Sequence, residues 1–183
     1  MEGCKIGALM SANLPSFQPS VLPAFQASMG KTLVLGLGNP ILTDDGVGIH
    51  VVRKVEQTGL PAGTSCAQAS VGGLRLLDAL TGYDRVILVD ALQTRGGRPG
   101  DVYRLQLHDA QGSLHSGSTH DLSLTGALDV GRHLGMDLPG DDAVTIVAIE
   151  VSDVLTFGET CTQAVTEAIP VAVRAVLDEL ATG

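Results

Sequence analysis

Tryptophan is absent from this sequence of 183 residues, which also has only 3 phenylalanines and 2 tyrosines. The hydrophobic fraction of 44% therefore comes mainly from Val, Leu, Ile and Ala, and there are 23 glycines. Side chains of this size suit buried parallel strands with helices packed closely on both faces of the sheet. The length of about one domain and the 17% of charged residues favour a single globular unit with a packed core.

Basic residues are scarce, with 11 Lys and Arg against 20 Asp and Glu, which gives a formal net charge of -9. Binding to nucleic-acid phosphates or to anionic lipids depends on accumulated Lys and Arg. We therefore expect neither nucleic acid nor a membrane as a partner. No apolar run approaches the ~20 residues of a spanning helix, and the first thirty residues lack the compact apolar segment of a signal peptide. These absences predict a soluble, cytoplasmic protein.

Cysteine is also scarce, and Cys4, Cys66 and Cys161 form no CxxC pair. They are expected to be reduced thiols, which excludes a disulfide framework and a zinc knuckle. Cys161 has no histidine or basic residue beside it in the sequence, which argues against a cysteine nucleophile. The serine-nucleophile pattern GxSxG and the phosphate-binding pattern GxxxxGKS/T are missing as well.

Two regions of the chain differ in pattern. Residues 1–30 scatter proline and serine among single apolar residues without any regular period, so we expect a disordered N-terminal extension. Residues 31–183 alternate strand and helix patterns, which predicts a single α/β domain with a parallel sheet between helices. The predicted strands are 32–37, 64–69, 85–90, 101–107 and 143–151, and the predicted helices are 46–58, 73–80, 121–134 and 161–181.

One connection differs from the rest. Only residues 91–100 separate strand 85–90 from strand 101–107, which is too short for a crossover helix. The two strands are therefore predicted to form an antiparallel hairpin, with 101–107 as a half-exposed edge strand. The segment 108–119 would then have to return to the end of the sheet where Asp90 lies, which would bring His120 close to Asp90.

Three acidic residues follow strands at the carboxyl edge of the sheet, where open α/β sheets bind their ligands. Asp44 and Asp45 come after the first strand and Asp90 ends the third. Asp45, Asp90 and His120 would supply two carboxylates and one imidazole, a set compatible with nickel, zinc or another divalent ion. Three protein ligands leave coordination positions open for water or substrate. The absence of sulfur ligands indicates an ion that binds only transiently.

Each ligand candidate also has a simpler interpretation that the residues leave open. Asp45 precedes Gly46 and would be an ordinary helix N-cap. Asp90 would hydrogen-bond loop amides at a strand end, and His120 would cap the following helix. The glycine-rich stretch from Gly36 does not make a dinucleotide site, because Ile41 replaces the third glycine of GxGxxG and no acid ends the second strand.

Four stretches together resemble the hydrogenase maturation endopeptidase family over residues 31–181. They are GLGNPILTDDGVG (36–48), ILVDA (87–91), STHDL (118–122) and AIEV (148–151). The GLGNP segment alone also resembles peptidyl-tRNA hydrolases. Two features depart from some family members, which have Glu where this chain has Asp45 and a glycine-threonine loop where it has residues 69–73.

The resemblance implies a three-layer α/β/α sandwich with a five-stranded, mostly parallel sheet and one antiparallel edge strand. It implies an endopeptidase that removes the C-terminal extension of a nickel-iron hydrogenase large-subunit precursor after nickel insertion. Asp45, Asp90 and His120 would bind Ni²⁺ carried by that precursor, and other divalent ions are compatible. We expect a monomer of aspartic type in which Asp45, Asp90 or Asp44 acts as general base and the nickel aids recognition.

Two other functions stay open on the residues alone. A peptidyl-tRNA hydrolase-like esterase shares the segment 36–40, although the acidic charge and the Asp44-Asp45-Gly46 sequence argue against RNA binding. A non-catalytic, nickel-dependent chaperone of the large subunit would use the same ligands without cleaving a peptide bond. An RNA-binding assay separates the first from the expected protease, and mass spectrometry of the precursor separates the second.

Overall fold

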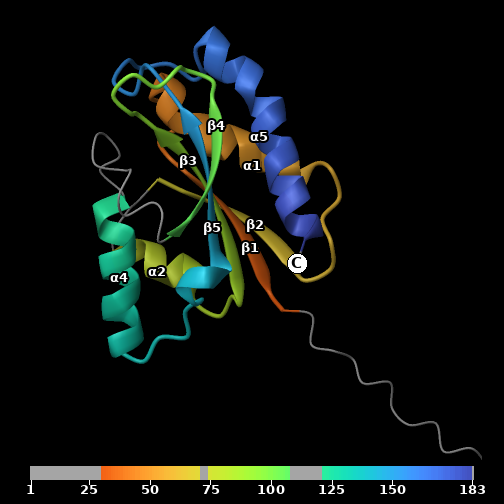
Figure 1. Ribbon diagram of the computed structural model, residues 1–183, viewed down its shortest axis with the longest axis vertical. Helices are drawn as coiled ribbons and strands as arrows, with labels where there is room; N and C mark the ends of the chain where they lie inside the picture. Colours follow the sequence, from red (N-terminus) through yellow and green to blue (C-terminus); the bar gives the residue numbers. More distant parts are fainter. Residues whose placement is uncertain (1–29, 71–73, 108–120, 183) are drawn as a thin grey trace, which may run out of the picture.

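The computed structural model describes residues 30–70, 74–107 and 121–182, and within these ranges a five-stranded sheet lies between two layers of helices (Figure 1). The sequence-based prediction of a three-layer α/β/α sandwich is confirmed. The strands are β1 (Thr32–Leu37), β2 (Thr64–Ala69), β3 (Arg85–Leu92), β4 (Val102–Gln106) and β5 (Val144–Glu150). The helices are α1 (Val47–Glu56), α2 (Leu74–Leu80), α4 (Asp121–His133) and α5 (Gln163–Ala181), with short 3-10 turns η1 (Thr43–Gly46) and η2 (Asp141–Ala143). The expected N-terminal extension lies, apart from Gly30, outside the described residues.

The strand order is β2-β1-β3-β5-β4, and all neighbours are parallel except the pair of β4 and β5. The predicted hairpin between the third and fourth strands is wrong in its pairing, because β5 lies between β3 and β4. β5 is buried along its whole length, whereas β4 is only half-buried, so the more apolar strand takes the interior place. Residues 93–101 cross the end of β5, and the backbone of Glu150 bonds to Gly100 and Asp101 there.

The predicted element boundaries agree with the structure to within two residues, and the difference at the end of β3 bears on the site. This strand continues to Leu92 instead of ending at Asp90. Ala91 and Leu92 stay in the sheet because they pair with Ile149 and Glu150 of β5. Asp90 therefore projects from within a strand, which fixes its backbone on both sides.

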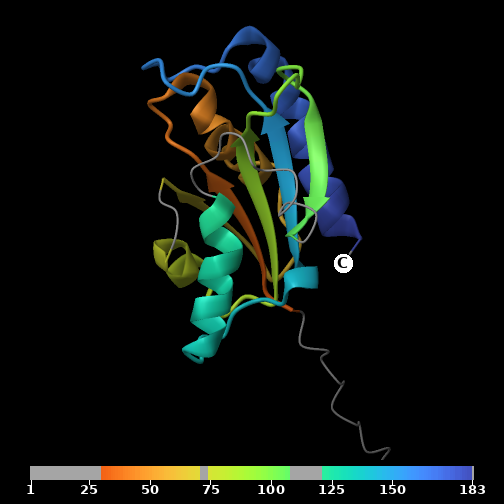
Figure 2. The same cartoon turned by 60° about the vertical axis from the view of Figure 1, so that its left-hand side comes forward.

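Two apolar cores fill the layers. On one face, α1 and α5 pack on the sheet, and on the other face α2 and α4 do so (Figures 1 and 2). The side chains of Leu88 and Leu92 belong to the core under α2 and α4, so Asp90, which alternates with them, projects to that face. Within the described residues, no helix is both long and apolar enough to span a membrane.

Glycines allow α1 to approach the sheet unusually closely. A Cβ built on Gly36 of β1 would lie 2.5 Å from the carbonyl oxygen of Gly48, and one on Gly48 would lie 2.2 Å from that of Val89. Gly38 has a φ of 123° and its Cβ would collide with the carbonyl oxygen of Asp45 at 1.8 Å. These glycines of the glycine-rich stretch therefore serve the close packing of α1 on the sheet.

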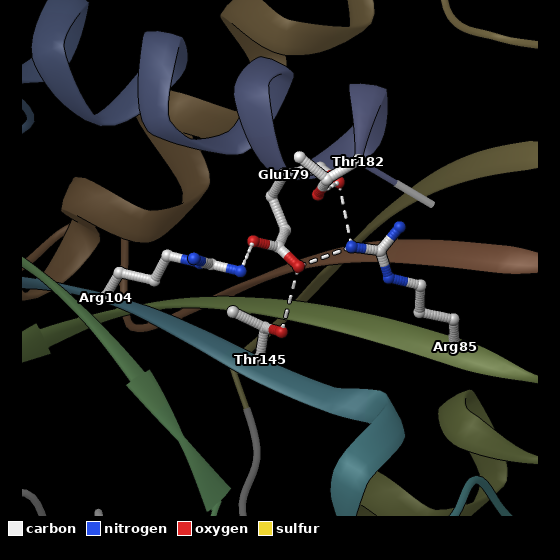
Figure 3. Close-up of polar contacts among 5 residues, drawn as sticks. All are labelled: Arg85, Arg104, Thr145, Glu179 and Thr182. Atoms are coloured by element: carbon white, nitrogen blue, oxygen red, sulfur yellow. Dashed lines mark hydrogen bonds and ion pairs between the residues drawn. The ribbon is translucent and has the colours of Figure 1, made fainter.

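A buried carboxylate joins α5 to three strands away from the carboxyl edge. Glu179 is only 5% exposed and forms ion pairs with Arg85 of β3 and Arg104 of β4 (Figure 3). It also accepts a hydrogen bond from the hydroxyl of Thr145 on β5 at 3.2 Å, while the Arg85 guanidinium donates to its backbone carbonyl at 2.8 Å. This Glu179 cluster fixes the end of the last helix to the sheet.

Candidate functional site

Three loops meet at the carboxyl edge of the sheet, formed by residues 38–46, 93–101 and 151–162 (Figure 2). The side-chain amide of Gln93 donates to the carbonyl of Ser152 at 3.2 Å, and the amide of Asp44 donates to the carbonyl of Asp153 at 2.9 Å. The loop 151–162 thus contacts both of the others. The candidate site residues Asp44, Asp45 and Asp90 lie in or beneath this group of loops.

Asp45 lies in η1, which carries the chain from β1 to α1. Its carboxylate accepts a hydrogen bond of 2.6 Å from the backbone amide of Asn39 and has no other side-chain hydrogen bond to the described residues. The interpretation of Asp45 as the helix N-cap is wrong, because Gly46 occupies that position and no side chain caps α1. The carboxylate is half-buried, and it keeps lone pairs available for a metal ion or a proton.

Asp90 is 5% exposed, and its Oδ1 accepts a hydrogen bond of 2.8 Å from the backbone amide of Ala91. Because β1 and β3 are parallel neighbours and η1 packs against β3, Asp45 and Asp90 come from separate segments to the same edge of the sheet. The strand pattern predicts both residues at this edge, and their joint binding of an ion with His120 stays a prediction. Carboxylates brought to one edge supply oxygen ligands of the kind that bind divalent cations.

The third predicted ligand, His120, lies outside the described residues, and so does the segment 108–119 that leads to it. Within residues 30–70, 74–107 and 121–182, no group of three or more His, Cys, Asp or Glu side chains forms a metal site. The direction of α4 is as predicted: it descends from the carboxyl side of the sheet to the amino side, where the backbone carbonyl of Asp137 accepts a hydrogen bond from Gly82 (Figure 1). His120 immediately precedes this helix in the sequence.

Asp44 has a different environment from Asp45. It is completely buried, and its carboxylate accepts five hydrogen bonds from the loop 151–162. The donors are the amides of Ser152, Asp153 and Thr162 and the hydroxyls of Ser152 and Thr162, at 2.7 to 3.3 Å. The lone pairs of this carboxylate are occupied by the loop, so the geometry favours a positioning role for Asp44.

We expect Asp44→Asn to lower the free energy of unfolding by about 3 kcal/mol, because an amide nitrogen would then face buried N–H groups that need an acceptor. Urea denaturation followed by circular dichroism measures this change. Glu159→Gln on the same loop is the matched control, since Glu159 is exposed, and its effect should stay within about 0.5 kcal/mol. If Asp44→Asn and Glu159→Gln are equally stable, Asp44 does not position the loop 151–162.

Glu150 is a buried acid to which the sequence pattern assigns no role. It is 2% exposed, and its two carboxylate oxygens accept hydrogen bonds from the amide and hydroxyl of Thr94 at 2.6 and 3.0 Å. A Cβ on Gly97 would lie 2.2 Å from the carboxyl carbon of Glu150, so a larger residue there would displace the carboxylate from Thr94. Glu150 thereby holds the loop 93–101 against β5. The signal in the sequence is a charged residue that ends an otherwise apolar strand.

His50 is a second residue near the site that received no role from the sequence. It lies in the first turn of α1, and a Cβ on Gly46 would be 3.5 Å from its Nε2. Burial, with smaller contributions from Arg53 and Lys54, lowers the pKa of His50 and so favours the neutral imidazole. Among the described residues Nε2 has no hydrogen-bond partner.

The described cysteines do not supply a nucleophile. Burial raises the pKa of the Cys66 thiol to about 11, and Glu56 adds to the effect. Burial, and then the nearby charge of Asp44, raises the pKa of the Cys161 thiol to about 11 as well. Both side chains are therefore protonated at neutral pH, which agrees with the prediction of unreactive thiols.

Comparison with known proteins places these observations in a family. The model of the family described as hydrogenase maturation protease matches residues 49–179, a range that includes Asp90 and begins just after Asp45. The hydrogenase 2 maturation protease of Escherichia coli is 30% identical over 107 residues, which are 57% of this chain and 65% of that protein. The hydrogenase expression/formation protein HupD of Rhodobacter capsulatus is 30% identical over 115 residues, 58% of this chain and 53% of that protein.

The fold supports the same assignment. The structure of the hydrogenase maturating endopeptidase HybD from E. coli matches with a TM-score of 0.70 and 28% identity, covering 83% of this chain and 93% of that one. The sequence alignments, in contrast, span less than two thirds of the two curated relatives. Since the family model covers well over half of the sequence, the chain belongs to the hydrogenase maturation protease family.

Proposed function

We propose that this protein is an endopeptidase that removes the C-terminal extension of a nickel-iron hydrogenase large-subunit precursor after nickel has been inserted. Membership of the hydrogenase maturation protease family supports the reaction class. The observation that carries the proposal for this chain is the position of Asp45 and Asp90, two carboxylates from separate segments at one edge of the sheet. The protein would act in the cytoplasm as a monomer.

Nickel enters this proposal as part of the substrate. Asp45, Asp90 and His120 would contact the Ni²⁺ of the precursor, so that only a loaded precursor is bound in the correct position for cleavage. Oxygen and imidazole ligands are compatible with nickel, and the lack of thiolates at the described edge suits an ion that must leave with the product. The scissile peptide bond would lie beside the metal, where the ion can polarise its carbonyl.

The general base would be Asp45 or Asp90. Both carboxylates lie at the edge, and the half-buried Asp45 has a single hydrogen-bond donor among the described residues. Asp44 is a poorer candidate for this role, because its oxygens accept five hydrogen bonds already. A base in this position would take a proton from the water that attacks the scissile carbonyl.

The test is mass spectrometry of the precursor before and after incubation with the protein, with nickel-loaded and nickel-free precursor compared. We expect release of one C-terminal peptide from the loaded precursor and rates at least about 100-fold lower without nickel. Binding without any mass change would establish the chaperone alternative. Hydrolysis of a peptidyl-RNA ester instead of the precursor would establish the esterase.

A further inference from the structure

Exposed apolar side chains gather at the carboxyl edge of the molecule. Among the described residues, six large hydrophobic side chains are exposed, and three of them lie on the loops 38–46 and 151–162. These are Ile41, Leu155 and Phe157, exposed by 49%, 84% and 79%. We call these three residues the edge patch. Clustered exposure of this kind marks surfaces that bind other molecules.

The backbone of the edge patch is fixed. Leu42 forms β-bridges with Phe157 and Gly158, and the amide of Gly158 donates to the carbonyl of Ile41 at 3.0 Å. The hydroxyl of Thr43 donates to the carbonyl of Thr156 at 2.7 Å, and the buried Asp44 carboxylate holds the same loop from beneath. Hydrogen bonds and β-bridges thus fix the backbone that carries these large, exposed apolar side chains.

The two segments that carry the edge patch have charges of one sign, whereas Arg95 and Arg98 lie on the third loop of this edge, 93–101. The segments 36–46 and 151–162 contain no Lys, Arg or His, but four acids, Asp44, Asp45, Asp153 and Glu159. Asp153 accepts hydrogen bonds from the amides of Leu155 and Thr156 at 3.2 and 2.9 Å, which places a carboxylate directly beneath the patch. An occupant that complements this surface is apolar in the middle and basic at its flanks.

We propose that the edge patch binds an apolar segment of the hydrogenase large-subunit precursor that is flanked by basic residues. The inference rests on the proposed function, because the occupant is the substrate of that reaction. The precursor is favoured over other occupants by position, since Ile41 is four residues before Asp45 and on the same short loop. The edge patch therefore lies within reach of the residues that flank a cleavage point held at Asp45.

The test combines binding and cleavage with the double variant Leu155→Ser/Phe157→Ser. The dissociation constant of the nickel-loaded precursor and the KM of its cleavage should both rise at least about tenfold, while kcat stays within about twofold. Leu134→Ser is the matched control, because Leu134 is 76% exposed and follows α4, away from the carboxyl edge. Glu159→Lys should weaken binding by about threefold at low salt and much less at high salt.

The outcomes separate this inference from the proposed function. If the wild-type protein cleaves the precursor and the double variant does so with an unchanged KM, the edge patch is not a substrate surface, while the protease assignment stands. If the wild type binds the precursor without cleaving it, the protease assignment fails, and a weaker-binding double variant still supports the patch. Sedimentation that shows a wild-type dimer, dissociated by Phe157→Ser, would reassign the patch to self-association and overturn the inference.

Discussion

Asp90→Asn should abolish release of the C-terminal peptide from a nickel-loaded precursor, with a rate loss of more than about 100-fold. Asparagine keeps the volume of the side chain and an oxygen that can accept the hydrogen bond from Ala91, so the β3 backbone should not change. What it removes is the negative charge at the sheet edge, which in the proposed function contacts the nickel of the precursor and can accept a proton. Time-resolved mass spectrometry of the precursor measures the loss.

Three controls make this result specific to the site. Asp178→Asn changes a carboxylate of α5 whose side chain is 64% exposed and paired with Arg174, and it should cleave at the wild-type rate. Asp45→Asn should be as inactive as the Asp90 variant, whereas Asp45→Glu, which keeps the charge, should retain activity. If Asp90→Asn processes the precursor at the full rate, Asp90 neither binds the metal nor takes part in catalysis.

Gly48→Ala should lower the free energy of unfolding by more than about 4 kcal/mol, the largest stability effect that we expect in this protein. The added Cβ would lie 2.2 Å from the carbonyl oxygen of Val89 and 2.5 Å from that of Leu37. Both atoms belong to the backbone of neighbouring strands, so no side-chain rotation can relieve the collision. α1 would have to withdraw from the sheet and open the core beneath it.

Gly126→Ala is the control, and it is expected to change the free energy of unfolding in the opposite direction. Gly126 also lies in a helix, but apart from its chain neighbours and the backbone of that helix, none of the described residues has a heavy atom within 4 Å of the position of its Cβ. Alanine there should raise stability by about 0.5 to 1 kcal/mol, since glycine is the poorer helix former. Thermal unfolding followed by circular dichroism compares the two variants, and similar midpoints would show that close packing of Gly48 does not limit stability.

Much of the fold follows from local pattern. The strands β1 and β2 have the predicted boundaries, because short apolar or half-apolar runs there are bounded by Gly and Pro. The neighbour of β4 could not be predicted in the same way. A strand spacing is about 4.8 Å, so the loop 93–101 is long enough either to form a hairpin or to cross β5. The burial of β5, which depends on the complete sheet, decides between the two.

The candidate site was predictable at the level of strands but not of side chains. Parallel strands place their carboxyl ends at one edge, which is why Asp45 and Asp90 could be expected together. Adjacent and identical, Asp44 and Asp45 could not be distinguished by sequence. The turn η1 gives them different environments, since one carboxylate is held by Ser152, Asp153 and Thr162 and the other by Asn39. The interaction between Glu150 and Thr94 depends on a contact between residues 56 positions apart.

The Glu179 cluster bears on how the chain folds as it is made. The ribosome releases Arg85 and Arg104 long before Glu179, which is the carboxylate that both guanidinium groups require. Until the end of α5 emerges, one face of the sheet also lacks the apolar cover of Val165, Ala172 and Val176. A nascent or truncated polypeptide without residue 179 would therefore remain open to proteolysis, and native structure would form only after nearly the whole domain has been translated.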